Sequence, residues 1–224
     1  MIRLIPKVLD ANALDAVREA LAGMNFVDGR ASASAMLHDR KYNLQRERTS
    51  RQADDLDLLV VDALRHNEEF ERATLPRRII PPLFNRYEVG MHYGPHVDAA
   101  LMGARETPLR ADVSVTVFLT EPEDYEGGEL IIQTDIVDEE IKLPAGSAVI
   151  YPSIFHHWVE PVTAGRRDAA VLWVQSFVRD PNDRAMLFEL SQASGLLNAE
   201  NAGGEAARLV NKTYTNLLRK LAEV

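Results

Sequence analysis

The sequence predicts a mostly β protein with flanking helices, built around an antiparallel sandwich or jelly-roll core. Between Arg77 and Val178, apolar and polar residues alternate with the period of two that strands have. Tight turns containing glycine and proline, rather than helices, separate these short strands, which favours an antiparallel over a parallel sheet. Before and after this region the apolar residues recur at helical spacing, so helices are expected on both sides.

The composition narrows the classes of function. The chain has 224 residues, 46% of them hydrophobic, which is enough for one well-buried catalytic domain with extensions. Its 25 basic and 34 acidic residues give a net charge of -9, which argues against a general attraction to nucleic acid or to an anionic membrane. The absence of cysteine excludes disulfides, zinc–thiolate sites and thiol nucleophiles. No apolar run resembles a signal peptide or approaches the roughly 20 residues of a membrane span, so a soluble cytoplasmic protein is expected.

Residues 1–76 are expected to form a helical support region packed on the core. A short strand over Ile2–Ile5 precedes a helix that Asp10 or Asn12 can cap. The stretch 28–51 has neither period, which predicts a loop or an irregular strand, in a position to lie over the mouth of a pocket. Two further helices are expected, over 56–64 and from Phe70.

Residues 77–178 are expected to contain the strands of the core. The alternation of Val113, Val115 and Val117 with polar or aromatic neighbours predicts a strand with one apolar side. Gly127 and Gly128 predict a two-residue hairpin turn. A later hairpin is expected to turn between Pro161 and Gly165. The expected strands are 78–80, 83–87, 91–93, 113–119, 130–132, 141–143, 148–151 and 169–174.

Residues 179–224 return to the helical period. Asp180 is a suitable N-cap with Pro181 at the first helical position, and Gly203 precedes a second, leucine-rich helix. This last helix can pack on the core or on another subunit, so a homodimer is one expectation.

A possible metal site lies at the end of a β-like run. In an extended chain alternate side chains share a face, so His96 and Asp98 can hold one metal ion. The later histidines are His156 and His157, of which only one can face the same pocket, and spacing alone does not choose between them. Two nitrogens and one carboxylate on one face of an ion leave the opposite face open, as in non-heme Fe(II) oxygenases.

A set of motifs in fixed order gives this site a family context. The motifs are Asn85-Arg86-Tyr87, Tyr93-Gly94-Pro95-His96-Val97-Asp98, Phe118-Leu119, Gly127-Gly128-Glu129-Leu130, Leu143-Pro144-Ala145-Gly146, Tyr151-Pro152-Ser153, His157, Arg167 and Trp173-Val174-Gln175-Ser176. Together they resemble the bacterial PKHD-type hydroxylases, relatives of prolyl 4-hydroxylase in the Fe(II)/2-oxoglutarate dioxygenase superfamily. The resemblance covers nearly the whole chain.

The resemblance implies a double-stranded β-helix and a specific set of ligands. The iron ligands of the family match His96, Asp98 and His157, and the arginine that binds 2-oxoglutarate matches Arg167. The implied reaction uses dioxygen and 2-oxoglutarate to hydroxylate a substrate, and releases succinate and CO2. Fe(II) is the implied metal, and ascorbate the implied reductant that keeps it ferrous.

The chemistry of the side chains agrees with these roles. The guanidinium of Arg167 is planar and always charged, so it suits a carboxylate, whereas the plainer alternative is a surface arginine like Arg166. Tyr87 is either a hydroxyl donor to the cosubstrate or a core tyrosine, and Trp173 is either a pocket wall or core. Phe118 replaces a tyrosine of animal prolyl hydroxylases, so Ser114 or Thr116 is a candidate hydroxyl partner of Arg167.

Other readings stay open at this stage. A metal hydrolase or a cupin-like isomerase could use the same ligands without 2-oxoglutarate, and a non-enzymatic sensor could bind iron and 2-oxoglutarate without turnover. His92, Arg105 and Arg110 are candidate substrate contacts, although structural or solvated roles are preferred for them. The substrate is not identified: a prolyl or other peptide side chain follows from the family name only, and a small metabolite is equally open.

Overall fold

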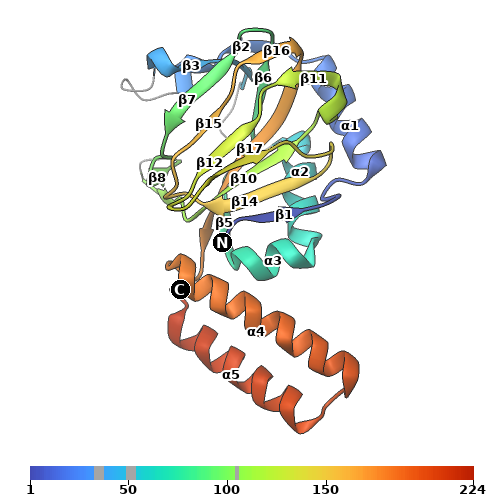
Figure 1. The fold of residues 1–224 in the computed structure, drawn as a ribbon, viewed down its shortest axis with the longest axis vertical. Coiled ribbons are helices and arrows are strands. Elements are labelled where there is room, and N and C mark those ends of the chain that lie inside the picture. The colour runs from blue at the N-terminus through green and yellow to red at the C-terminus, as the bar shows by residue number, and fades with distance from the viewer. Residues whose placement is uncertain (33–37, 49–53, 104–105) are drawn as a thin grey trace.

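The core of the protein is a pair of antiparallel sheets (Figure 1). The structure is a computed structural model and describes residues 1–32, 38–48, 54–103 and 106–224. The strands of the larger sheet lie in the order β1 (Arg3–Ile5), β14 (Ala148–Pro152), β10 (Val113–Phe118), β17 (Arg167–Ser176), β6 (Leu83–Tyr87), β4 (Leu44–Arg46) and β2 (Phe26–Asp28), and β5 (Pro76–Ile79) pairs with β17. The strands of the smaller sheet lie in the order β13 (Asp138–Ile141), β12 (Leu130–Gln133), β15 (His157–Val159), β7 (His92–His96) and β3 (Lys41–Tyr42). Two short ribbons complete the strands: β11 (Tyr125–Gly127) with β16 (Val162–Gly165), and β8 (Leu101–Met102) with β9 (Leu109–Arg110). The predicted jelly-roll class is confirmed.

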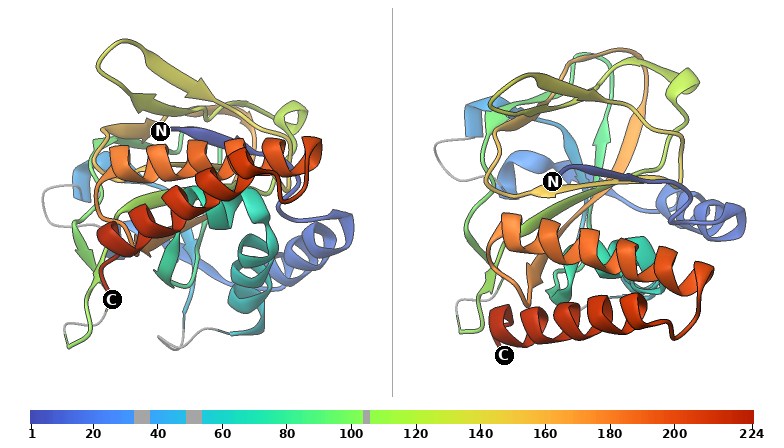
Figure 2. Two further views of the ribbon diagram at one scale, coloured as in Figure 1. Left: turned by 90° about the horizontal axis from the view of Figure 1, so that it is seen from below. Right: turned by 60° about the horizontal axis from the view of Figure 1, so that its bottom comes forward.

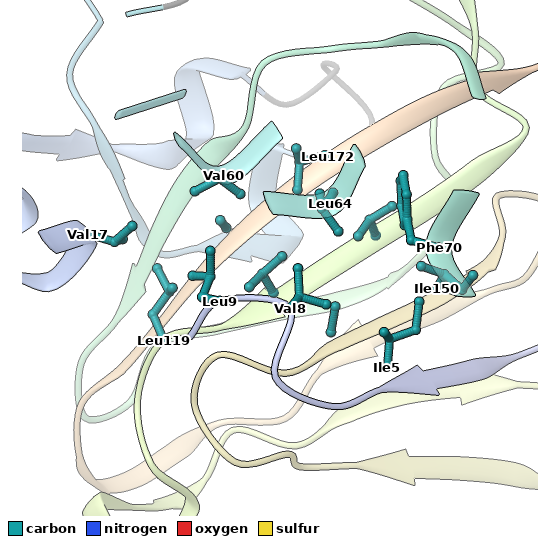
Figure 3. Packing of buried hydrophobic residues seen from close by; sticks show 14 of the residues in the cluster. Ile5, Val8, Leu9, Val17, Val60, Leu64, Phe70, Leu119, Ile150 and Leu172 are labelled. Carbon is teal, nitrogen blue, oxygen red and sulfur yellow. The ribbon is translucent and has the colours of Figure 1, made fainter. Parts of the chain in front are cut away.

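Three N-terminal helices cover the outer face of the larger sheet. They are α1 (Ala11–Ala22), α2 (Asp55–His66) and α3 (Glu68–Thr74). Asp10, one of the two predicted caps, begins α1 by accepting a hydrogen bond from the backbone N–H of Ala13 at 2.8 Å. The apolar sides of these helices bury Val60, Leu64 and Phe70 against the sheet (Figure 3).

Strand β10 shows how the larger sheet separates two interiors. Val113, Val115 and Val117 face the helices and belong to the large apolar cluster. Ser114 and Thr116 point to the opposite side, yet they are buried as well. The predicted apolar side is therefore confirmed, while the polar side faces the space between the two sheets instead of solvent.

The N-terminal region contributes more to the sheets than a helical support region would. The stretch 28–51, predicted as a loop or an irregular strand, contains β3 and β4, which extend the smaller and the larger sheet respectively. The proposed division at residues 76 and 178 stays a prediction. Two short 3₁₀ turns, η1 (Gly29–Ser32) and η2 (His38–Arg40), precede β3, and a third, η3 (Pro122–Asp124), precedes β11.

The two hairpins predicted at Gly127-Gly128 and between Pro161 and Gly165 do not form, because their strands pair with other strands. Strand β11 pairs with β16, and β12 with β13 and β15, so Gly127 and Gly128 do not close a hairpin. Both glycines have a φ of 68°, and a Cβ at Gly127 would lie 2.2 Å from the carbonyl oxygen of Pro161. The strand of His157 likewise pairs with β7 and β12, whereas the strand of Arg167 lies in the other sheet. A polypeptide that crosses between two sheets has the same local pattern as a hairpin.

The C-terminal helices form an antiparallel pair beside the sheets (Figure 2). As predicted, Asp180 caps α4 (Pro181–Glu200), and α5 (Glu205–Leu221) follows Gly203. Helix α4 also contacts α3. Ala207 is the buried residue of α5. A homodimer stays a prediction. Within the described residues, no helix has the length and apolar character needed to cross a bilayer.

A buried ion cluster fastens β4 to α2. Asp57 is 0% exposed and accepts hydrogen bonds from Arg46 at 2.8 Å and from Arg48. The Arg46 guanidinium also pairs with Asp54 at 3.0 Å. The neighbouring residue of β4, Gln45, lines a cavity between the two sheets that also contains His96 and Arg167. The ion cluster therefore connects this cavity wall to α2.

We expect Asp57→Asn to lower the free energy of unfolding by about 3–5 kcal/mol, because the substitution leaves Arg46 buried without its main counter-charge. Urea denaturation followed by circular dichroism measures the effect. The matched control is Asp62→Asn, an exposed position on the same helix, which should change stability by less than about 0.5 kcal/mol. Equal stabilities of the two variants would contradict the assigned role.

Candidate active site

Two histidines and one aspartate converge between the sheets. His96 ends β7 and His157 begins β15, and the two residues are partners in the antiparallel register of these strands. Asp98 lies two residues after His96, beyond the end of β7, and its carboxylate lies 4.0 Å from His96 Nε2. The candidate ligand atoms all lie within 4.8 Å of one another. His156 is exposed, so of the two neighbouring histidines it is His157 that points inward.

The backbone fixes the orientation of both imidazole rings. Nδ1 of His96 lies 2.9 Å from the carbonyl oxygen of Gly94, and Nδ1 of His157 lies 3.1 Å from that of Phe155. Because a carbonyl oxygen can only accept, each Nδ1 carries the hydrogen and donates it. In a neutral ring with this tautomer, Nε2 is the nitrogen that has the lone pair. Nε2 of His96 lies 4.0 Å from the carboxylate of Asp98, and Nε2 of His157 lies 3.7 Å from it.

Burial keeps the imidazole of His96 neutral. The pKa of His96 is lowered to about 4, first because burial disfavours the charged ring and then because His157 lies close to it. The ring of Tyr93 stacks on His96 with the centroids 3.8 Å apart. A neutral imidazole is the form that binds a metal, so the ring is ready to ligate at physiological pH.

Two serines hold the carboxylate. The Ser114 hydroxyl donates to Asp98 Oδ2 at 2.6 Å, and the Ser153 hydroxyl lies 2.7 Å from that of Ser114. Since Ser114 gives its hydrogen to the carboxylate, Ser153 must donate to Ser114. The expectation that Ser114 assists Arg167 is therefore wrong, because its hydroxyl is already committed to Asp98.

Arg167 is buried at the other side of the cavity. It begins β17, is 2% exposed, and its guanidinium lies between the rings of Tyr87 at 5.2 Å and Phe118 at 5.3 Å. Within the described residues its Nε has no hydrogen-bond partner, and no carboxylate forms an ion pair with it. The alternative of a surface arginine fits its exposed neighbour Arg166 instead. A buried cation without a counter-charge is costly, so this position suits an anionic ligand.

Tyr125 was missed by the sequence analysis. Gly128 lies against both the Tyr125 ring and the Arg167 side chain. A Cβ added at Gly128 would lie 3.1 Å from Arg167 Cδ and 3.3 Å from Tyr125 Cε2. The Tyr125 hydroxyl is buried and has no hydrogen bond within the described residues. Tyr125 is thus a better placed hydroxyl group beside Arg167 than Ser114. Its position on a short crossover ribbon gave no signal in the sequence.

One cavity of about 540 Å³ joins all of the predicted site residues. They are His96, Asp98, His157, Arg167, Tyr87 and Trp173. Burial raises the pKa of Tyr87, so its hydroxyl stays protonated at neutral pH and is able to donate. The indole Nε1 of Trp173 is buried without a partner among the described residues. Tyr87 and Trp173 therefore belong to the cavity wall rather than to the apolar core alone.

The weaker candidates lie elsewhere. His92 is absent from the residues that line the cavity and directs Nδ1 to the carbonyl of Gly90 at 3.2 Å. Arg110 pairs with Asp112 at 2.6 Å and with Glu223 at 2.7 Å, which is a structural role. Arg105 lies outside the described residues.

Comparisons with known proteins find relatives over the whole length of the chain. The family model of the 2OG-Fe(II) oxygenase superfamily matches residues 82–175. A PKHD-type hydroxylase of Synechococcus elongatus is 44% identical over 100% of both chains, and one of Paraburkholderia phymatum is 46% identical over 98% of both. Among solved structures, a prolyl-4-hydroxylase of Pseudomonas putida is similar with a TM-score of 0.53 and 21% identity, over 78% of this chain and 92% of that one. At that identity the structural likeness supports the fold.

We expect Ser114→Ala to weaken the binding of a divalent metal by about 10- to 100-fold, because Asp98 loses the hydroxyl group that orients it. Anaerobic titration with Fe(II), or with Mn(II) in air, measures the dissociation constant. Ser191→Ala is the control, since the Ser191 hydroxyl bonds to Phe188 in α4, away from the cavity. If both variants bind metal as wild type does, the hydroxyl has no part in positioning the ligand.

Proposed function

The chain belongs to the PKHD-type hydroxylase family, which makes it a 2-oxoglutarate-dependent dioxygenase, and we propose that its cavity residues divide this chemistry between them. His96, Asp98 and His157 hold Fe(II), and Arg167 binds the distal carboxylate of 2-oxoglutarate. Two imidazoles and one carboxylate are the donor set of non-heme Fe(II) oxygenases, so the residues fit the metal.

When bound, Fe(II) and 2-oxoglutarate supply the oxidation of a substrate C–H bond by dioxygen, with release of succinate and CO2. The protein contributes position and environment. The carbonyls of Gly94 and Phe155 aim the two Nε2 atoms, and Ser114 aims the carboxylate of Asp98. Tyr87 offers a protonated hydroxyl to the cosubstrate. Apolar side chains in the wall, such as Trp173, limit the access of water.

The observation that carries this proposal is the buried guanidinium of Arg167, with which no carboxylate in the described part of the chain forms an ion pair. A hydrolase or a cupin-like isomerase with the same ligands needs no buried cation at this place. A diacid does, because one carboxylate reaches the metal while the other requires a counter-charge. The apolar residues that also line the cavity then accommodate a substrate, which a sensor without turnover would not need.

The substrate and the reductant are proposed more broadly. A prolyl or other peptide side chain agrees with the name of the similar prolyl-4-hydroxylase of Pseudomonas putida. The exposed apolar residues Val97 and Leu101 at the cavity offer contacts for such a side chain. Ascorbate is proposed as the reductant that keeps the iron ferrous. A cytoplasmic location stays a prediction.

We expect Arg167→Met to weaken 2-oxoglutarate binding by roughly 100-fold, because the distal carboxylate would be buried without its counter-charge. The measurement is an anaerobic titration of the Fe(II)-loaded protein with 2-oxoglutarate, followed by addition of oxygen and a succinate assay. Affinity for Fe(II) should be unchanged, since Arg167 is not a metal ligand. Arg166→Met, the exposed neighbour, is the control and should behave as wild type.

Failure to make succinate, together with unchanged binding of 2-oxoglutarate by the variant, would contradict the proposal. If the wild type produces no succinate with any candidate substrate, and Arg167→Met binds 2-oxoglutarate as tightly as wild type does, the cavity is that of a hydrolase or an isomerase.

A further inference from the structure

Lys41 is a charge in the cavity wall that the proposed chemistry does not use. It begins β3, at the edge of the smaller sheet, in register with Tyr93 of β7. The side chain is buried, with the residue 6% exposed, and its Nζ lies 5.1 Å from the centre of the Tyr93 ring. The same ring stacks on His96. The ammonium group and a proposed metal ligand therefore lie against the same aromatic ring.

This ammonium group has no counter-ion from the chain. Its Nζ donates one hydrogen bond, to the Ser32 hydroxyl at 2.7 Å. Among the described residues no carboxylate forms an ion pair with it. The residues outside the description, 33–37, 49–53 and 104–105, include no aspartate or glutamate. Burial lowers the pKa of Lys41 to about 8, although the more distant Asp98 and Asp28 partly oppose the shift.

With Fe(II) and 2-oxoglutarate bound, the cavity has one positive charge in excess. The charged side chains that line it, among the described residues, are Lys41, Asp98 and Arg167. The positive charges of Fe(II) and Arg167 balance the negative charges of Asp98 and of the two carboxylates of 2-oxoglutarate. Lys41 alone remains uncompensated. A substrate with one negative charge would neutralise the buried site, and such pairing is what burial of an ion requires.

The surroundings of Lys41 restrict that anion further. Gln45 and Asn43 both donate to the amide oxygen of Asn85, at 2.7 and 3.1 Å, so this part of the wall is held together by its own hydrogen bonds. The cavity lining also includes a large apolar set, to which Ile80, Leu83, Leu101, Met102, Val171 and Trp173 belong. A phosphate would bring more than one negative charge to a single ammonium group. A carboxylate on an apolar skeleton fits both the charge and the wall.

We propose that Lys41 binds a carboxylate of the substrate, so that the enzyme hydroxylates an apolar monocarboxylate at a C–H bond held near the metal. The inference rests on the proposed function, because the balance of charges assumes bound Fe(II) and 2-oxoglutarate. The class includes a fatty acid and the C-terminus of a peptide, which share this chemistry.

The test uses two probes that differ in charge alone, 3-phenylpropanoate and 3-phenylpropanamide. Each is titrated calorimetrically into the full-length protein loaded anaerobically with Fe(II) and 2-oxoglutarate, whose visible absorption band reports that the cosubstrate stays bound. Wild type should bind the carboxylate at least tenfold more tightly than the amide. Lys41→Met should lose this preference while its affinity for 2-oxoglutarate stays within about twofold. Lys212→Met, the same substitution at an exposed position of α5, should retain the preference.

Several outcomes would overturn the proposal. Equal binding of the two probes by wild type would do so without any variant, even if Lys41→Met does not fold. A preference that persists in Lys41→Met would place the anion site elsewhere. Loss of 2-oxoglutarate binding in Lys41→Met would assign the lysine to the cosubstrate. A wild-type protein that does not bind 2-oxoglutarate at all would overturn the proposed function, and this inference with it.

Discussion

A buried positive charge that the chain does not neutralise governs the organisation of this protein. Arg167 is enclosed by the rings of Tyr87 and Phe118, and within the described residues no carboxylate pairs with it. A buried cation of this kind is tolerated when a ligand supplies the negative counter-charge. The larger sheet supplies this cation and the smaller sheet supplies the histidines, so the reacting groups are brought together only when both sheets close on one cavity. The fold and the chemistry therefore depend on the same packing.

The proposed metal site is prepared by the backbone before any ion arrives. Carbonyl oxygens two residues upstream hold Nδ1 of each histidine, and paired serines hold the carboxylate of Asp98. Preset orientations of this kind reduce the entropy lost when a ligand binds. The outer face of the larger sheet serves a different purpose, because its valines pack against α1, α2 and α3 and give the cavity a rigid wall.

Local patterns in the sequence predicted the local elements well. Strand β6 spans Leu83–Tyr87 as expected, and Asp180 caps α4. The ligand set followed from ordered motifs, since spacing alone left His156 and His157 equivalent. Strand pairing failed because it depends on close contacts between distant segments, such as that of Gly127 with Pro161. Lys41 could not be recognised either, because a polar residue facing a cavity and one facing solvent have the same sequence pattern.

The central claim is that one cavity places a metal ion and a diacid between the two sheets. A crystal structure of the protein grown anaerobically with Mn(II) and 2-oxoglutarate tests it most directly. The account predicts an anomalous peak for manganese bonded to His96 Nε2, His157 Nε2 and the carboxylate of Asp98, with the distal carboxylate of 2-oxoglutarate on Arg167. A manganese ion bound elsewhere, or a diacid that leaves Arg167 unpaired, would contradict it.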